Sequence, residues 1–174
     1  MAEHRTNIYS ERVTIRRTTE GDLPDINKLW NDGRAMKWVG FPDGLGYDDK
    51  KLKAWFERLQ ADSHRHHFVV HAPEIGFCGE VYYEVDKAHR RAALDIKFVP
   101  EAQGRGLATD AFKMLIKLVF ESEAEVDAVW TEPYEENTAS RKLYARCGLT
   151  PKPRPADMEP GPSYWELRRE AGCY

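Results

Sequence analysis

The segment Gln103–Ala108, with the sequence QGRGLA, lies between a strand-like run and an apolar helix. Its two glycines let a ligand approach the backbone closely, and the first N–H groups of a helix have no partner within the helix. Such a junction favours a phosphate or pyrophosphate at the positive end of the helix dipole. Arg105 adds a side chain for a charge-assisted contact. The segment therefore predicts an anion site.

Two common phosphate loops do not match this segment. A Walker loop ends in Gly-Lys-Ser/Thr, whereas this chain has Gly106, Leu107 and Ala108. A dinucleotide fingerprint requires a third glycine where Thr109 stands, and a parallel βαβ unit. On the loop alone, a tight turn without a ligand and a protein that binds nucleotide phosphates both stay open.

A second group of polar residues lies in NTASRKLYARCGL, residues 137–149. The phenol of Tyr144, with an ordinary pKa of about 10, can act as a general acid. Core packing is the alternative for Tyr144, because apolar residues share its helical face. Asn137 is suited to cap the helix, and Ser140 can be a solvated helical serine, so neither requires a ligand.

A general base is harder to assign than an acid. An alkylamine is mostly protonated at pH 7, so transfer of a group to it requires a carboxylate or a water chain to take its proton. Four acidic residues lie on predicted strands: Glu80, Glu84, Asp95 and Glu132. For each, a solvated face or a salt bridge is the more common role of a charged strand residue.

No residue pattern predicts a metal site. His64, His66 and His67 lack the i, i+4 helical pair, and we expect them in a hydrated turn. Cys147 has no adjacent base and falls on a buried helical stripe, which predicts an inert core thiol.

The elements that position these residues are indicated by hydrophobic periodicity. We expect the order β-α-α-β-β-β-α-β-α-β, with a meander of three strands before the glycine loop. This order predicts an α+β fold: a mixed, mostly antiparallel central sheet flanked by helices. The expected strands are RVTIRR, residues 67–72, 76–85, 91–99 and 128–132, and a strand near 163–169; the expected helices lie near 23–30, 48–60, 106–120 and 137–146.

Length and charge limit the class of protein. The chain has 174 residues with a formal net charge of -3, which fits a short extension over residues 1–10 and one domain over 11–174. No long basic block predicts nucleic-acid binding, and no apolar run is long enough to cross a bilayer. The polar start and the three cysteines without a metal-binding spacing suggest a cytoplasmic protein with reduced thiols.

Together, the two segments resemble the GNAT superfamily of acyl-CoA-dependent N-acyltransferases. The family pattern Gln/Arg-x-x-Gly-x-Gly/Ala is met by Gln103–Ala108, and Asn-x-x-Ser-x-x-x-Tyr-x-x-x-Gly is met by residues 137–148. The element order is also that of the family, and the resemblance covers roughly residues 11–168. It implies the GNAT fold and the use of acetyl-CoA.

The resemblance also implies site residues. The backbone of Ile96 to Val99 would bind the pantetheine arm, with an N–H near Phe98 or Val99 polarising the thioester carbonyl. Tyr144 would protonate the leaving thiolate, and Asp95 or Glu132 would act as the base. The expected cofactor-binding residues are Ile96, Phe98, Val99, Gln103, Gly104, Arg105, Gly106, Leu107, Ala108, Asn137, Ser140 and Tyr144.

Within the superfamily, the sequence is most similar to the branch with ribosomal-protein amino-terminal, spermidine and aminoglycoside 6'-N-acetyltransferases. The implied function is transfer of acetyl to a primary amine, either a small molecule or a peptide amino terminus, by a protein that can form a homodimer. The acceptor would enter beside residues 37–49, where Asp43, Asp48 and Asp49 would attract it. A non-catalytic acyl-CoA-binding module is the alternative.

Overall fold

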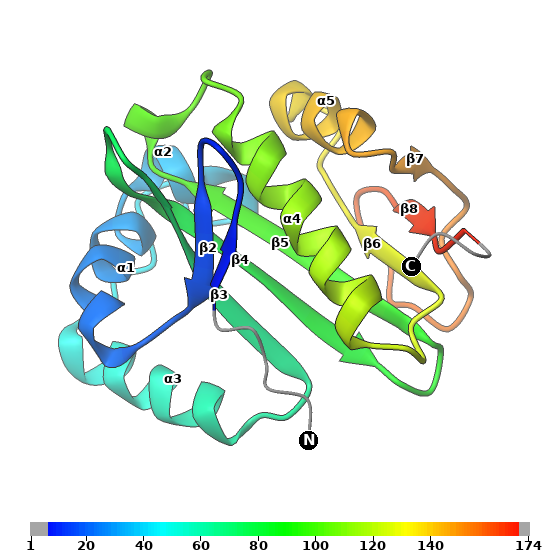
Figure 1. Cartoon of the computed structure of the whole chain (residues 1–174), viewed down its shortest axis with the longest axis horizontal. Helices are drawn as coiled ribbons and strands as arrows, with labels where there is room; N and C mark the ends of the chain where they lie inside the picture. Colours follow the sequence, from blue (N-terminus) through cyan, green and yellow to red (C-terminus); the bar gives the residue numbers. More distant parts are fainter. Residues whose placement is uncertain (1–6, 171–174) are drawn as a thin grey trace.

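The computed structural model describes residues 7–170, which form an eight-stranded sheet in the order β1-β2-β3-β4-β5-β6-β8-β7 (Figure 1). All neighbouring strands are antiparallel except β5 and β6, which are parallel. The prediction of a mixed, mostly antiparallel sheet flanked by helices is confirmed.

The elements have the following bounds. The strands are β1 Asn7–Tyr9, β2 Thr14–Arg17, β3 Arg65–Ala72, β4 Gly76–Asp86, β5 Arg91–Phe98, β6 Ala128–Thr131, β7 Thr150–Pro151 and β8 Trp165–Arg168. The helices are α1 Leu23–Trp30, α2 Gly33–Met36, α3 Asp49–Ala61, α4 Leu107–Ser122 and α5 Thr138–Arg146, with short 3-10 turns η1 Glu20–Asp22, η2 Lys37–Val39 and η3 Pro100–Ala102.

The predicted element order is present, and three short elements join it. Strand β1 pairs with β2 and so brings residues 7–9, expected to belong to an extension, into the sheet. Helix α2 and strand β7 have four and two residues, which is too short to show a period in the sequence. None of the three changes the order of the longer elements.

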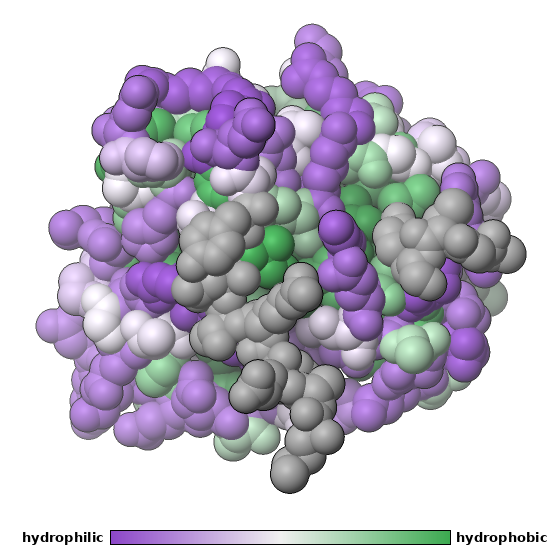
Figure 2. Space-filling model, in the orientation of Figure 1, coloured by the Kyte–Doolittle hydropathy of each residue, from purple (hydrophilic) through white to green (hydrophobic). Residues whose placement is uncertain are grey.

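One face of the sheet packs against α4 and α5. Helix α4 crosses in front of the sheet in Figure 1 and buries an apolar stripe that includes Phe112, Leu115 and Val119. These side chains meet inward-facing strand residues such as Val81 and Leu94 in one core cluster. The outward side of α4 is polar, and Figure 2 shows this side of the molecule as largely hydrophilic. We call this face the α4 face.

The other face carries α1, α2 and α3. Leu23, Ile26 and Leu29 of α1 pack with Leu52 of α3 and with Val69 of β3 in a second, smaller cluster. Because side chains alternate along a strand, the neighbours of the residues in the first core point to this face. We call it the α1 face.

Strands β5 and β6 pair over three residues only. Arg91–Ala93 pair with Ala128–Trp130, whereas β5 continues to Phe98. After Ala93, β5 no longer pairs with β6, and no other strand among residues 7–170 pairs with β5 on that side. We call residues 94–98 the open edge of β5. On its other side β5 lies so close to β4 that a Cβ on Gly79 would come within 2.0 Å of the Lys97 carbonyl oxygen.

Among residues 7–170, no helix combines the length and the hydrophobicity that a membrane span requires.

Candidate active site

The glycine loop follows the open edge of β5 and begins α4. Gly104 and Gly106 have φ angles of 73° and 79°, a left-handed conformation that favours glycine. Gly106 is the N-cap residue of α4 and supplies no side chain to the first helical N–H groups. A Cβ on Gly104 would meet no atom within 4 Å, so the loop is open to a ligand there.

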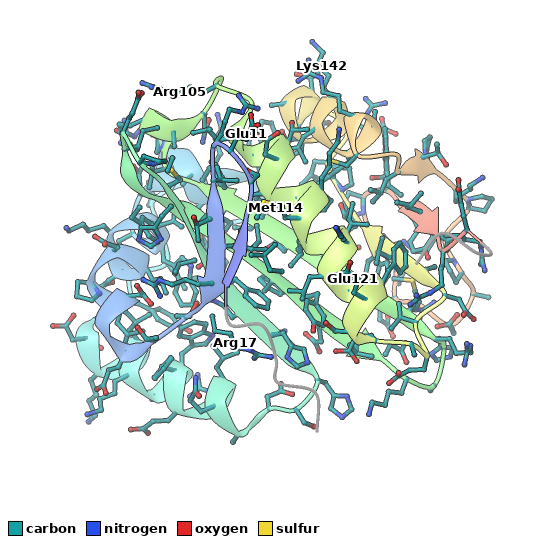
Figure 3. All side chains as sticks on the ribbon, in the orientation of Figure 1. Glu11, Arg17, Arg105, Met114, Glu121 and Lys142 are labelled. Carbon is teal, nitrogen blue, oxygen red and sulfur yellow. The ribbon has the colours of Figure 1, made fainter. Side chains whose placement is uncertain are left out.

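Arg12 brings a second positive charge to this loop. Its Nη1 donates a hydrogen bond to the Arg105 carbonyl at 3.0 Å, and its guanidinium lies 2.7 Å from Asp110 of α4. Figure 3 shows Arg105 beside the start of α4. Sequence reasoning missed Arg12, which lies 93 residues from Arg105 and belongs to no local pattern. The loop and both arginines suit the diphosphate of coenzyme A.

The open edge of β5 presents backbone groups beside this loop. The Val99 N–H donates to the Cys78 carbonyl at 2.9 Å, so Val99 turns its N–H towards the β4 side. In an antiparallel pair the backbone N–H and C=O groups of successive residues point to opposite sides of the strand. The N–H and C=O groups of Ile96 and Phe98 therefore point away from β4. The Phe98 carbonyl accepts from Gln103 Nε2 at 3.0 Å. Val99 uses its N–H and its carbonyl within the fold, so Phe98 is the better placed of the two predicted N–H donors.

Tyr144 is buried, 6% exposed, and packs against Phe112 with ring centroids 5.0 Å apart. Burial and the charge of Asp95 raise the pKa of its phenol, although hydrogen bonds with Thr131 and Ser140 act in the opposite direction. The phenol therefore keeps its proton at neutral pH. Its place in the core and the acid role implied by the motif are compatible.

Asn137 caps α5, as its sequence position predicted. Its Oδ1 accepts from the Ser140 N–H at 3.1 Å. Contact of either residue with the cofactor stays a prediction. Gly148, just beyond the helix, has a φ of 91°, as expected for a residue that ends it.

Asp95 lies on the α1 face of β5 and is 24% exposed. Its Oδ1 accepts from the Ile96 N–H at 2.9 Å, and its Oδ2 pairs with the ammonium of Lys97. Burial opposes the charged form of Lys97, but Asp95 and Glu80 outweigh it and raise the pKa of the ammonium. An acidic side chain thus lies directly beside the open edge.

Of the two roles expected for Glu80, a solvated face or a salt bridge, the structure shows the second, because its side chain is 1% exposed and lies between two basic groups. Its Oε1 accepts from Trp30 Nε1 at 2.9 Å and lies 3.4 Å from Lys97 Nζ. Its Oε2 lies 3.2 Å from His67 Nε2, and neither atom has a hydrogen bond among the described residues. Burial raises the pKa of Glu80, but electrostatic interaction with His67 and Lys97 outweighs it and gives a net pKa of about 2.

His67 was predicted in a hydrated turn, and that prediction is wrong. Strand β3 begins at Arg65, so His66 and His67 are strand residues, and His67 is buried with its Nδ1 2.8 Å from Thr18 Oγ1. The expected strand began at His67, so the observed start at Arg65 lies two residues earlier.

The other base candidates have basic partners. Glu84 pairs with Arg65, whose Nε lies 3.0 Å from Glu84 Oε2. Glu132 pairs with Arg154 at 2.7 Å. Near the expected acceptor entrance, Asp48 caps α3 by accepting from the Lys51 N–H at 2.8 Å. Asp48 therefore has a structural role there.

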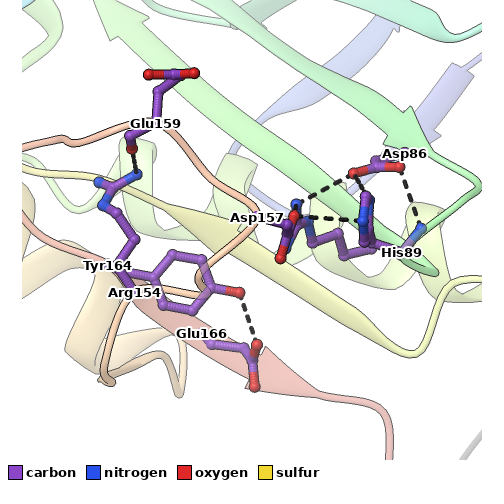
Figure 4. Close-up of polar contacts among 8 residues, drawn as sticks. Asp86, His89, Arg154, Asp157, Glu159, Tyr164 and Glu166 are labelled. Carbon is purple, nitrogen blue, oxygen red and sulfur yellow. Dashed lines mark hydrogen bonds and ion pairs between the residues drawn. The ribbon is translucent and has the colours of Figure 1, made fainter.

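Two further features carry no catalytic assignment. Burial raises the pKa of the Cys147 thiol to about 11, as the prediction of an inert thiol requires. Asp86, His89 and Asp157 form the one cluster of metal-ligand type found among residues 7–170, but Arg91 forms ion pairs with both carboxylates. Figure 4 shows this network joining the turn after β4 to the connection 152–164.

Comparisons with known proteins agree with this geometry. A family model described as an acetyltransferase (GNAT) domain matches residues 12–150. A spermidine N(1)-acetyltransferase of Vibrio cholerae is 25% identical over 141 residues, which is 80% of each chain.

Solved structures share the fold at lower identity. A Vibrio cholerae spermidine N-acetyltransferase in complex with CoA and spermine has a TM-score of 0.76 and 23% identity, covering 91% of this chain and 96% of the other. An aminoglycoside acetyltransferase in complex with coenzyme A has a TM-score of 0.74 and 19% identity, covering 90% and 95%. The alternative of a non-catalytic binding module finds no support in these comparisons.

The family model spans most of the chain and includes both the glycine loop and the segment with Tyr144. This protein therefore belongs to the GNAT acetyltransferase family and is an N-acetyltransferase that uses acetyl-CoA.

Proposed function

We propose that the protein transfers acetyl from acetyl-CoA directly to a primary amine, with the pyrophosphate at Gln103–Ala108 and the pantetheine arm along the open edge of β5. The open edge carries this proposal: it presents outward backbone groups beside a glycine loop at a helix N-terminus. Bound there, acetyl-CoA supplies an acetyl thioester. Residues of this chain would polarise the acetyl carbonyl, protonate the leaving sulfur and take the proton of the amine.

The N–H of Phe98 is suited to polarise the acetyl carbonyl. Alternation along β5 turns it away from β4, and a rigid strand holds its direction. A preorganised donor of this kind stabilises the negative charge that develops on the carbonyl oxygen. The Ile96 N–H, now bonded to Asp95, would bind the pantetheine arm once the carboxylate turns away.

Tyr144 would donate its proton to the leaving sulfur. Its raised pKa keeps the phenol protonated, and Asp95 and Lys97 both act on it electrostatically, as expected for a hydroxyl that lies on the same side as the open edge. Both base candidates pair with a cation, Asp95 with Lys97 and Glu132 with Arg154, and Asp95 is the better one because it lies directly beside the open edge. The amine would lose its proton to Asp95 before attack.

The acceptor would reach this point on the α1 face, between the helices and the connection 152–164. Asp157 joins that connection to Arg91, and Tyr164 stacks on Trp130 at 5.6 Å. Tyr82 and Asp95 lie half-buried on the same face. Small amines and peptide amino termini are both compatible with this entrance.

We further propose a cytoplasmic location, since Cys78 and Cys147 are free thiols. A homodimer is proposed from the family resemblance and is tested by light scattering during gel filtration. Retention as a monomer across micromolar concentrations would contradict it.

Release of coenzyme A thiol in the presence of primary amines tests the proposed reaction. Tyr144→Phe should slow turnover about 100-fold while coenzyme A binding changes little, because a general acid acts in the transition state. Tyr83→Phe is the matched control: its hydroxyl bonds Glu123 instead, at 3.0 Å. Equal turnover of the two variants would remove Tyr144 as the acid.

A further inference from the structure

Besides Asp86, which pairs with His89 and Arg91, strands β4 and β5 and the residue after β6 carry four carboxylates on the α1 face: Glu80, Glu84, Asp95 and Glu132. A site for a polycationic amine requires several carboxylates that are accessible and free of other cations. The charge state of these four side chains therefore bears on the class of acceptor. Any inference about the acceptor rests on the proposed function, the transfer of acetyl to an amine.

Lys97 carries the ammonium that the inner pair of carboxylates share. Its ammonium pairs with Asp95 and lies 3.4 Å from Glu80 Oε1, and its side chain is 11% exposed. Both oxygens of Asp95 are engaged, one by Lys97 and one by the Ile96 N–H. Glu80 is too deeply buried to meet an acceptor. Asp95, with a side chain that is 24% exposed, is the inner carboxylate that an amine can reach, and the amine would have to displace one of its partners.

Arg65 neutralises the next carboxylate on the strand. Its guanidinium donates to Glu84 and lies 5.2 Å from the centre of the Tyr82 ring. Lys97 Nζ lies 5.1 Å from the same ring. Tyr82 thus has two fixed cations beside it, each already paired with a carboxylate, so a further ammonium arriving there finds these carboxylates occupied and has two cations within the screening length in physiological salt, about 8 Å.

Arg154 neutralises the fourth carboxylate and is itself held in place. It pairs with Glu132 at 2.7 Å and donates to the carbonyls of Glu159 and Ser163, at 3.1 and 2.7 Å. Figure 4 shows the bond between Arg154 and Glu159. Its side chain is 18% exposed. A guanidinium fixed by three partners cannot turn aside for a substrate cation without losing those bonds.

We propose that the acceptor is an amine whose single positive charge is at the reacting nitrogen, and that Arg65, Lys97 and Arg154 exclude polycationic acceptors. Asp95 then faces one ammonium, which loses its proton to become the nucleophile. In this respect the protein differs from the spermidine and aminoglycoside acetyltransferases that share its fold.

The test is two series of acceptors in which the number of positive charges rises from one to three. Thiol release from acetyl-CoA is measured with 5-amino-1-pentanol, 1,5-diaminopentane and spermidine, and with amino-terminal tripeptides that contain no, one or two further lysines. Within each series kcat/KM should fall at least about tenfold with each added charge, as expected for a site that opposes extra cations. A rise of kcat/KM with charge would overturn the inference while leaving the proposed function intact.

Turnover with none of the amines would contradict the proposed function and, with it, this inference. The variants then distinguish electrostatics from shape. Arg154→Gln frees Glu132, and Arg65→Gln frees Glu84 without disturbing the connection 152–164. Each should raise kcat/KM for spermidine about five- to tenfold relative to 5-amino-1-pentanol.

Lys117→Gln is the control variant, because it also removes one positive charge but frees Glu121 on the exposed side of α4, on the opposite face of the sheet. It should leave the ratio between the two acceptors unchanged. An equal change in all three variants would show that net charge alone sets the preference, and would overturn the assignment of Arg65 and Arg154.

Discussion

The two faces of the sheet are built by alternate residues of the same strands, yet their chemistry differs. On β4, Val81 and Tyr83 join the apolar core on the α4 face, whereas Glu80 and Tyr82 point to the α1 face. The α4 face is held by apolar packing against residues such as Phe112. The α1 face buries a carboxylate among an imidazole, an ammonium and an indole instead.

This difference teaches that burial serves two purposes in one sheet. Apolar side chains on the α4 face gain free energy when they leave water. Charged side chains lose their hydration when they are buried. A buried ion pair is therefore often no more stabilising than apolar residues of similar volume at the same positions. We therefore expect the charged cluster on the α1 face to serve the reaction, and the variants below test this.

The largest expected effect concerns the α4 face. Phe112 is fully buried, and Phe112→Ala should lower the free energy of unfolding by about 3–5 kcal/mol through lost burial and the cavity that remains. Urea denaturation measures it. Phe41→Ala, at an exposed phenylalanine, is the control and should change little. Similar losses in both variants would contradict the assignment of the core.

On the α1 face, Glu80→Leu should cost about 3 kcal/mol, because it leaves Lys97 with Asp95 alone and removes the buried partner of Trp30 Nε1 and His67 Nε2. The double variant Glu80→Leu with Lys97→Met should regain part of that stability while losing turnover. Recovery of both stability and turnover would mean that the cluster has no part in the reaction.

Acid should weaken the α1 face first. The pKa of Glu80 falls from 4.5 to about 2 in the folded protein, so its contribution to stability is complete above pH 4.5 and is lost as pH falls towards 2. The urea midpoints at pH 7 and pH 5 should agree closely, and the midpoint at pH 3.5 should be lower. Glu80→Gln should decline less over the same range, and an equal decline would place the acid sensitivity elsewhere.

A smaller effect separates a cap from a ligand contact. Asp48 caps α3 on the α1 face, and Asn137 caps α5 on the α4 face. Replacing either by alanine should cost about 1 kcal/mol of stability. If Asn137 also touches the cofactor, Asn137→Ala alone should weaken coenzyme A binding, measured by calorimetry. Equal affinity in the two variants would leave Asn137 as a cap only.

Much of the fold could be predicted from local patterns. The helical stripe of residues 107–122 and the alternation along 76–86 were visible as periods in the sequence, and the glycines at 104 and 106 marked the turn between β5 and α4. The short strands β1 and β7 carried no such signal, because three- and two-residue strands form only when a longer neighbour offers a partner.

Prediction of the site was less complete. The loop, Tyr144 and Asp95 could be proposed from single segments, Tyr144 with the help of the family resemblance, and their roles stay predictions. Arg12 and the pairing of His67 with Glu80 depend on strand register, which joins residues far apart in the sequence. A charged residue in a strand is usually solvated, so burial of Glu80 could not be read from its own segment.

The unpaired run of β5 has a consequence for self-association. Exposed strand edges are templates on which a second chain can build, and the outer margins of this sheet are short: three residues in β1, and two in β7, one of them Pro151. The five residues 94–98 lie inside the strand order, between β4 and β6. The unpaired backbone groups of residues 94–98 therefore lie inside the sheet, where a narrow ligand such as the pantetheine arm would fit. A strand of a neighbouring protein has little room to pair there.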